Sequence, residues 1–329
     1  MRGNAPPAVG ASAPDARGHR PRIEVVAAVL QRPDGSFLLA LRPAGKVYAG
    51  YWEFPGGKVE PDEAPAAALI RELHEELGID VQQSYPWVTR DYDYEHAAVR
   101  LKFRRVTEWS GELHGRESQA FAWQRSGELT AAPLLPANGP ILRALALPVL
   151  YAISNAAQMG VDSFVRHLEA GLQRGVKLVQ LREKSLADDD LVRLASKVRQ
   201  LASEHGAKVL VNADPKLAVR AGADGVHLTA ARLMDVRSRP DCELVGASCH
   251  DERELAHAAR LGLDFAVLGP LADTASHPGA KTLGWTRFGD LVADYPLPVY
   301  AVGGLGRGDM HAAWSAGAHG IAAIRGAWS

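Results

Sequence analysis

Residues 57–79 read GKVEPDEAPAAALIRELHEELGI, and this stretch organises the first half of the chain. Asp62 is a suitable helix N-cap, Pro65 suits a first helical turn, and Gly78 suits the left-handed position after a helix C-terminus. The spacing therefore predicts a helix over 63–77. The segment inside these bounds is unusually rich in glutamate, and the placement of the glutamates indicates what the helix does.

The predicted helix separates apolar side chains from acidic ones. On a wheel of about 100° per residue, the apolar residues share one face and three glutamates lie roughly opposite: Ala66, Ile70, Leu73 and Leu77 against Glu72, Glu75 and Glu76. Like charges at this spacing repel, and the C-terminal half of a helix disfavours anions. If the acidic face were only solvated, this unfavourable arrangement of charges would have no explanation. Mg²⁺, in contrast, takes carboxylate oxygens together with water and substrate phosphates. The acidic face is predicted to be a metal site.

Other elements of the first half are indicated by composition. Ile23–Leu30 and Phe37–Leu41 flank Pro33-Asp34-Gly35, whose turn chemistry predicts a hairpin. From 96 to 106, apolar residues alternate with Arg and Lys, which is typical of a strand with one buried face. The first half is therefore predicted to be mixed α/β.

The stretch resembles the Nudix box, in which a glycine and a glutamate precede Arg-Glu-apolar-x-Glu-Glu-x-Gly-apolar, and every fixed position from Gly57 to Ile79 matches. The resemblance covers residues 23–147 and implies an α/β/α sandwich around a mixed sheet. It also implies hydrolysis of a nucleoside diphosphate linked to another group, with Mg²⁺, or Mn²⁺ in its place, as cofactor. The metal ligands implied are Gly57, Glu72, Glu75, Glu76 and Glu117, and the same four glutamates are the catalytic residues.

Segments outside the box resemble the MutT-type 8-oxo-dGTP diphosphatases. Arg42 and Phe54 match residues that line the nucleotide site in that subfamily, and Glu117 matches an extra catalytic glutamate. Asn138 would read the oxidised purine, because an amide offers both a donor and an acceptor. The alternatives are a solvated loop position for Glu117 and a turn position for Asn138. The resemblance implies water attack at the β-phosphorus, giving 8-oxo-dGMP and pyrophosphate, a reaction that keeps oxidised nucleotides out of DNA replication and repair.

Length and charge limit the number of domains and the kinds of partner that the chain can have. A chain of 329 residues suits two domains, and 37 Lys+Arg against 38 Asp+Glu indicate no nucleic-acid partner. Cys242 and Cys249 are too few for a disulfide scaffold, and no apolar run is long enough to span a bilayer, so a soluble cytoplasmic protein without a membrane partner is expected. Residues 1–22 are predicted to be a disordered tail, with an organelle transit segment as the alternative.

The second half, 148–329, contains short apolar runs separated by helix-like stretches, which predicts a (β/α)8 TIM barrel. Polar residues after barrel strands belong at the C-terminal rim, where active sites form. The predicted strands are Leu150–Ile153, Val176–Leu181, Val209–Val211, Gly225–Leu228, Leu244–Ala247, Phe265–Leu268, Val299–Val302 and Gly320–Ile324.

Four stretches of this half resemble the thiamine-phosphate synthase and thiazole tautomerase (TenI-like) family: VQLREK at 179–184, VN at 211–212, ADGVHL at 223–228 and AVGGL at 301–305. The resemblance implies a small phosphorylated ligand, such as a thiazole phosphate. It implies ligand contacts from Gln180, Arg182, Lys184 and Asn212, with phosphate contacts from Thr274, Ser276, Gly303 and Gly304.

Departures from the synthase pattern concern its two metal-binding aspartates. Ala213 stands at the first, and Thr229-Ala230-Ala231-Arg232 at the second, which argues against metal-dependent synthesis of thiamine phosphate. Asp214 next door is a weaker substitute. The tautomerase branch needs no such metal, and His250 would be its proton-transfer residue, against the alternative of a rim histidine without chemistry. Two further departures are His277, at a phosphate-binding lysine, and Arg325, at a small residue.

The leading interpretation is thus a MutT-type Nudix hydrolase fused to a TenI-like barrel. A competing interpretation makes the first half hydrolyse a thiamine-pathway pyrophosphate, with the barrel as its tautomerase partner. A third keeps the barrel as a non-catalytic module that binds a phosphate ligand.

Overall fold

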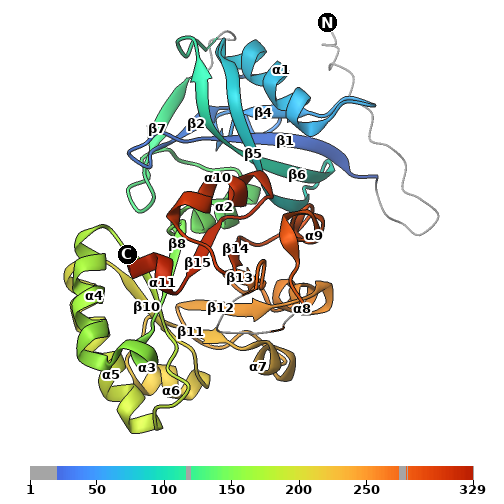
Figure 1. The fold of residues 1–329 in the computed structure, drawn as a ribbon. Coiled ribbons are helices and arrows are strands. Elements are labelled where there is room, and N and C mark those ends of the chain that lie inside the picture. The colour runs from blue at the N-terminus through green and yellow to red at the C-terminus, as the bar shows by residue number, and fades with distance from the viewer. Residues whose placement is uncertain (1–20, 116–119, 274–278, 280, 329) are drawn as a thin grey trace, which may run out of the picture. The chain divides into compact units, whose positions relative to one another are not determined.

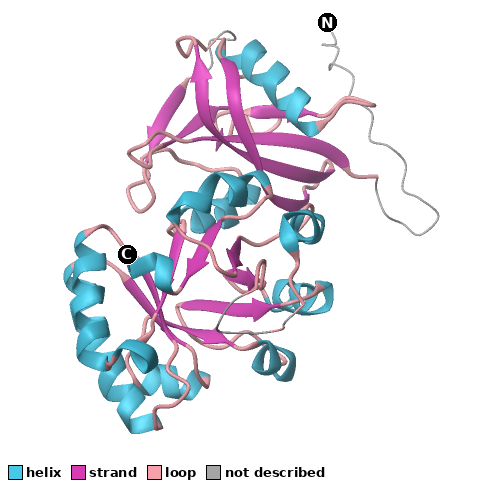
Figure 2. Ribbon diagram, viewed as in Figure 1, coloured by secondary structure: helices cyan, strands magenta, loops and turns pink. Residues whose placement is uncertain are grey.

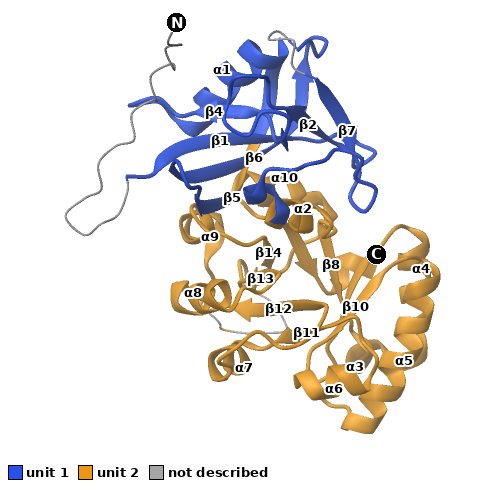
Figure 3. Cartoon of the chain, turned by 180° about the vertical axis from the view of Figure 1, so that it is seen from behind, with its two compact units in different colours: residues 1–84, 89–139 blue, residues 85–88, 140–329 orange. Residues whose placement is uncertain are grey.

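The structure is a computed structural model that describes residues 21–115, 120–273, 279 and 281–328. The chain divides into two compact units, one of residues 1–84 and 89–139 and one of residues 85–88 and 140–329 (Figure 1, Figure 3). The boundary expected between 147 and 148 stays a prediction, as does the tail over 1–22. Within the described residues, no helix is long and apolar enough to cross a membrane.

The first unit combines two sheets with one long helix (Figure 2). A four-stranded sheet has the order β4-β1-β6-β5, in which β1 pairs parallel with β6 and antiparallel with β4, and a three-stranded sheet has the order β3-β2-β7. The mixed α/β fold is confirmed. The elements are β1 (Ile23–Leu30), β2 (Phe37–Leu41), β3 (Trp52–Glu53), β4 (Gly56–Lys58), α1 (Pro65–Leu77), β5 (Asp80–Asp93), β6 (Ala98–Ser110), β7 (Phe121–Gln124) and the 3-10 turn η1 (Pro136–Asn138).

The hairpin predicted from β1 and β2 is wrong, although the turn between them forms. The Gly35 N–H donates to the Arg32 carbonyl at 3.0 Å, and the Asp34 carboxylate accepts from the Ser36 N–H and hydroxyl. The two strands then enter different sheets, and one bridge between Gln31 and Phe37 is what pairs them. Because β2 is buried almost throughout, it is better placed between neighbours of its own sheet than at a hairpin edge.

Helix α1 occupies the predicted position but begins differently. Gly78 takes the predicted left-handed conformation at φ 70°, whereas the N-cap is Ala64 and not Asp62. Pro65 begins the helix, so Asp62 stays in the preceding turn with φ 62°. The packed face is centred on Leu69, Leu73 and Leu77, while Ile70, predicted to be buried, is 44% exposed.

The second unit is a closed barrel in the order β10-β11-β12-β13-β14-β15-β8-β9, in which neighbouring strands pair in parallel, and the predicted TIM-barrel fold is confirmed. The strands are β8 (Leu150–Ile153), β9 (Leu178–Leu181), β10 (Lys208–Val211), β11 (Gly225–Leu228), β12 (Leu244–Cys249), β13 (Phe265–Leu268), β14 (Val299–Val302) and β15 (Gly320–Ala323). The helices are α2 (Gly139–Leu145), α3 (Ala156–Met159), α4 (Val161–Gln173), α5 (Asp188–Glu204), α6 (Pro215–Arg220), α7 (Ala230–Asp235), α8 (Glu252–Leu261), α9 (Gly284–Val292), α10 (Met310–Ser315) and α11 (Arg325–Trp328), with η2 (Arg307–Asp309) before α10.

Aromatic rings fill the interior of the barrel. Tyr151, Phe265 and Tyr300 are fully buried, and the Phe265 ring meets each tyrosine edge-on with centroids 5.2 Å apart. Such edge-to-face packing adds to the stability gained by burying the rings. The barrel is therefore a packed core, and its open space lies at the loop-bearing rim.

Candidate active sites

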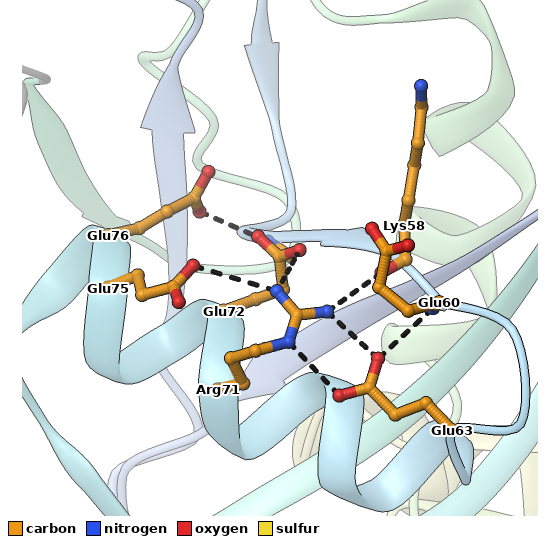
Figure 4. A network of polar contacts seen from close by, with 8 residues as sticks. Lys58, Glu60, Glu63, Arg71, Glu72, Glu75 and Glu76 are labelled. Carbon is orange, nitrogen blue, oxygen red and sulfur yellow. Dashed lines mark hydrogen bonds and ion pairs between the residues drawn. The ribbon is translucent and has the colours of Figure 1, made fainter.

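Arg71 binds three carboxylates of the first unit at once (Figure 4). Its Nε and Nη2 donate to the two oxygens of Glu63 at 3.0 and 2.9 Å, and its Nη1 donates to Glu72 at 2.8 Å and lies 3.6 Å from Glu75. Nη2 also donates to the carbonyl of Lys58 at 3.1 Å. The guanidinium thus ties α1 to β4 and fixes the direction of the Glu72 carboxylate.

Glu76 lies to one side of this ion-pair network, where its carboxylate faces Gly56, the first residue of β4. The Gly56 N–H is 3.4 Å from one Glu76 oxygen, a weak contact. Burial, and next the charge of Glu72, raise the pKa of Glu76 to about 7. Because two carboxylates one helical turn apart disfavour each other's ionisation, a cation between them would stabilise both.

Gly57 provides the room that Glu72 occupies. A Cβ atom at Gly57 would lie 2.1 Å from the Glu72 carboxyl carbon, so the missing side chain is what admits the carboxylate. Within the described residues, no three His, Cys, Asp or Glu side chains already form a metal cage. Glu75 is turned toward Arg71 and its side chain is 61% exposed, and Glu117 lies outside the described residues. The residues that fit a divalent ion are therefore Glu72 and Glu76, which suits Mg²⁺ because this ion commonly takes one or two carboxylates plus phosphates and water.

The residues expected to bind the nucleotide differ in exposure. Arg42 Nη1 donates to both oxygens of Glu53 at 2.6 Å, and burial raises the pKa of Glu53 despite this ion pair. Phe54 is 4% exposed and packs against Phe37 and Phe103, so its ring belongs to the core in this conformation. Asn138 is also 4% exposed, and its Nδ2 is 3.4 Å from the Trp52 carbonyl. A buried amide with one weak bond retains capacity for further partners.

An aromatic cluster beside Glu53 was not predicted from the sequence. The rings of Tyr94 and His96 lie 5.5 and 5.9 Å from that of Tyr48, and Tyr94 lies 5.5 Å from His96. Tyr48 has φ 62°, a rare conformation for a non-glycine residue that concentrates at functional sites. Burial, and then the charge of Glu53, raise the pKa of Tyr94 to about 12. The signal was present as Tyr-x-Tyr-x-His at 92–96, but the partner Tyr48 is remote in sequence.

A cavity of about 390 Å³ opens at the loop-bearing rim of the barrel. Two residues expected at this site, Thr274 and Ser276, lie outside the described residues, as does His277. The cavity brings together the other residues expected there: Gln180, Arg182, Lys184, Asn212, His250, Gly303 and Gly304.

His250 follows β12 and is held by α8. Glu254 accepts from the His250 backbone N–H at 2.6 Å and lies 3.0 Å from its Nδ1, so the carboxylate orients the ring. The imidazole side chain is 52% exposed and lines the cavity, which leaves Nε2 available to a ligand. A histidine oriented in this way is placed to give a proton to a ligand in the cavity or to take one from it.

Asp214 does not replace the missing aspartates. Its carboxylate caps α6 by accepting from the Lys216 N–H at 2.9 Å, and its second oxygen pairs with Arg232 Nη1 at 3.0 Å. Arg232 itself stands in the segment where the synthase pattern has its second metal aspartate. Arg232, which departs from the synthase pattern, therefore neutralises Asp214, the substitute that the sequence suggested.

His227 is a structural residue of the barrel, and its burial predicts an effect of pH on stability. Its Nε2 lies 2.9 Å from the Ser248 hydroxyl, and its Nδ1 lies 3.3 Å from the Tyr151 hydroxyl. Full burial, assisted by the charge of Arg182, lowers the pKa from 6.5 to about 3. Between these values the unfolded chain binds a proton that the folded chain does not, so acidification favours unfolding.

We therefore expect His227 to remove about 1.4 kcal/mol from the free energy of unfolding of the barrel for each pH unit below 6.5. Chemical denaturation at pH 7.5, 6 and 5 measures this slope. The matched control is His227→Asn, which retains hydrogen-bonding capacity without titrating in this range. Equal slopes for the control and the unmodified chain would show that His227 does not cause the effect.

Comparisons with known proteins match each half separately. Residues 26–144 match the family model described as NUDIX domain, and residues 150–327 match the model described as thiamine monophosphate synthase. The chain is 44% identical over 122 residues to a protein of Escherichia coli (strain K12) named CTP pyrophosphohydrolase, covering 37% of this chain and 90% of that protein. It is 32% identical over 170 residues to thiamine-phosphate synthase of Limosilactobacillus fermentum (strain NBRC 3956 / LMG 18251), covering 50% of this chain and 80% of that protein.

The solved structures that are similar to this chain include one of a thiamine phosphate enzyme. Thiamine phosphate pyrophosphorylase from Pyrococcus furiosus is 24% identical and covers 53% of this chain and 84% of its own, with a TM-score of 0.46.

Proposed function

Because this chain belongs to the Nudix family through its first half and to the thiamine monophosphate synthase family through its second, we propose that it hydrolyses nucleoside triphosphates to monophosphates and pyrophosphate, with 8-oxo-dGTP as substrate. The observation that carries the proposal is the arrangement on α1, where Arg71 fixes Glu72 in the space left by Gly57 and Glu76 lies beside it. Nudix hydrolases generally use a divalent metal such as Mg²⁺.

The residues of this site have different roles in the proposed reaction. Glu72 and Glu76 would hold Mg²⁺, which when bound offsets charge on the phosphates and activates a water. Arg71 keeps Glu72 oriented and, by holding Glu63 and Glu75 as well, limits the repulsion among the four carboxylates. A carboxylate of the cluster takes the proton of the attacking water. Arg42 is paired with Glu53 and would form part of the lining of the nucleotide site.

Asn138 supports the assignment of an oxidised purine. Its buried amide has a donor and an acceptor, and the one weak bond to Trp52 leaves the acceptor oxygen for the substrate. A site built to hydrogen-bond a base edge rejects bases that lack the matching groups. The second candidate substrate is CTP, favoured by the name of the Escherichia coli relative, CTP pyrophosphohydrolase.

The products test the proposed reaction. We expect incubation of the full chain with 8-oxo-dGTP and Mg²⁺ to release 8-oxo-dGMP and pyrophosphate in equal amounts. Release of inorganic phosphate and a nucleoside diphosphate would contradict the proposed site of cleavage. Hydrolysis of thiamine pyrophosphate in preference to any nucleotide would favour the competing thiamine-pathway function.

The aromatic cluster predicts how the base is held. Tyr94 contacts Tyr48 and His96 and lies beside Glu53, whose charge acts on Glu76, so a base stacked on this cluster would lie near the carboxylate site. We expect Tyr94→Leu to raise KM about tenfold with a smaller change in kcat, because base–aromatic stacking contributes roughly 1–3 kcal/mol. Tyr94→Phe keeps the ring and is the control. A KM unchanged in Tyr94→Leu would place the base elsewhere.

The second candidate activity is proton transfer in the barrel. The observation favouring it is His250, which lines the cavity while Glu254 orients its ring. His250→Asn should abolish turnover of a thiazole phosphate tautomer without changing its binding. Binding without turnover by the unmodified chain would instead favour the non-catalytic module.

A further inference from the structure

The loop that joins β2 to β3, residues 42–51, is held together by its first residue, Arg42. The Arg42 Nε donates to the carbonyl of Val47 at 2.8 Å, and Nη1 donates to both oxygens of Glu53 at 2.6 Å. The Arg42 carbonyl accepts from the Gly50 N–H at 3.0 Å. A guanidinium has donors in fixed directions, so one side chain can bind a loop carbonyl and a carboxylate at the same time. Arg42 therefore joins the middle of this β2–β3 loop to its end and to β3.

Tyr48 in this loop takes a backbone conformation that needs support from its surroundings. Its φ is 62°, in the left-handed region that residues other than glycine rarely adopt and that persists where the surrounding structure holds it. The carbonyl that Arg42 binds belongs to Val47, so it is part of the peptide that leads into Tyr48. The Tyr48 ring contacts those of Tyr51 and Tyr94, with centroid distances of 5.3 and 5.5 Å. The bond from Arg42 therefore helps to hold the Tyr48 ring against the aromatic cluster.

The β2–β3 loop also lies near the carboxylate site. Burial raises the pKa of both Glu53 and Glu76, and the charge of Glu72 adds to the rise at Glu76. The charge of Lys46, a residue of the loop, opposes the rise at both carboxylates. Because such effects weaken with distance, the loop is close to the site at which the nucleotide would be cleaved.

We propose that Arg42 is a positioning residue for nucleotide binding, which holds the β2–β3 loop so that Tyr48 contacts the base, and that it does not itself bind the nucleotide. The inference rests on the proposed function, since the base is that of the nucleotide substrate. The Arg42 guanidinium is bound to Val47 and Glu53 at 2.8 and 2.6 Å, and these hydrogen bonds would have to break before it could turn toward a phosphate. Its contribution to binding therefore passes through the loop.

Hydrogen exchange tests the structural part of the inference without a substrate. The N–H groups of Gly50 and Tyr51 donate to carbonyls within the loop. We expect Arg42→Lys to speed their exchange about tenfold or more, because lysine keeps the charge but has no fork that binds a carbonyl and a carboxylate together. Arg125→Lys is the matched control, since Arg125 pairs with Asp34 elsewhere in the same unit, and it should leave the exchange of this loop unchanged.

Steady-state kinetics tests how Arg42 acts on binding, with the nucleotide that the chain hydrolyses, 8-oxo-dGTP or CTP. We expect Arg42→Lys and Tyr48→Leu each to raise KM about tenfold while kcat changes less than about threefold, because contact with the base is lost. The double variant should also raise KM about tenfold, because both substitutions remove the same contact. Arg125→Lys should keep the KM of the unmodified chain, and circular dichroism checks that each variant is folded.

Two outcomes would overturn the inference. The first is unchanged exchange of the loop in Arg42→Lys. The second is a rise in KM of about a hundredfold in the double variant, since independent effects multiply and Arg42 would then bind the nucleotide directly. If the unmodified chain hydrolysed no nucleotide, the proposed function would be wrong, and the exchange measurement would still decide whether Arg42 holds the loop.

Discussion

Glu76→Gln is expected to lower kcat for nucleotide hydrolysis by roughly 10²–10⁴-fold, because it removes a carboxylate that would hold the metal and that belongs to the cluster proposed to take the proton of the attacking water. The amide has nearly the shape of the carboxylate, so packing on α1 is kept while the charge is lost. That charge is what Glu72 and Glu76 would jointly present to a divalent ion, and burial, followed by the charge of Glu72, raises the pKa of Glu76. Steady-state hydrolysis of 8-oxo-dGTP at saturating Mg²⁺ measures the effect.

Glu60→Gln is the matched control for this prediction. Glu60 is exposed, and its part in the network is the donation of its backbone N–H to Glu63, which the substitution preserves. Its kcat should therefore equal that of the unmodified chain. Wild-type turnover in Glu76→Gln at saturating Mg²⁺ would show that the box carboxylates have been assigned the wrong role.

Gly57→Ala is expected to lower kcat about 10²-fold while the fold is kept, because displacing a catalytic group by about 1 Å can cost that much. The added Cβ would lie 2.1 Å from the Glu72 carboxyl carbon and 2.2 to 2.3 Å from its oxygens. The carboxylate is the flexible end of a side chain, so it moves and gives up its 2.8 Å bond to Arg71. Activity and thermal unfolding of the same preparation separate the two effects.

Substitution of the neighbouring glycine, Gly56, is expected to reduce stability, whereas substitution of Gly57 is expected to reduce activity. A Cβ at Gly56 would lie 2.1 Å from the backbone carbonyl of Val26, and Gly56 has φ 147°. Gly56→Ala should therefore reduce stability, since strained backbone costs about 1–3 kcal/mol. Full activity in Gly57→Ala would contradict the role given to Glu72.

Periodicity and spacing were sufficient to predict the larger architecture. The eight apolar runs became eight barrel strands because parallel strands covered on both faces leave a continuous apolar signal. Helix α1 was predicted because Pro65 and Gly78 mark its ends by backbone geometry. Its packed face was less accurate, since the choice between Ile70 and Leu69 depends on how the sheet meets the helix.

Contacts between residues remote in sequence could not be predicted. The separation of β1 and β2 into two sheets depends on strands elsewhere in the unit, and the turn between them carries no such information. On sequence alone, Asp214 was a possible replacement for a missing aspartate, but in the structure it pairs with Arg232. The cluster of Tyr48 with Tyr94 joins two loops whose separate sequences give no sign of the contact.

The choice of substrate is tested most directly by competition. The full chain is incubated with equal concentrations of 8-oxo-dGTP and CTP in Mg²⁺, and the two monophosphates are quantified over the early part of the reaction. We predict a ratio of kcat/KM of about tenfold or more in favour of 8-oxo-dGTP, because the Asn138 amide is proposed to pair with its base edge. A ratio that favours CTP would contradict the assignment of an oxidised purine as the substrate.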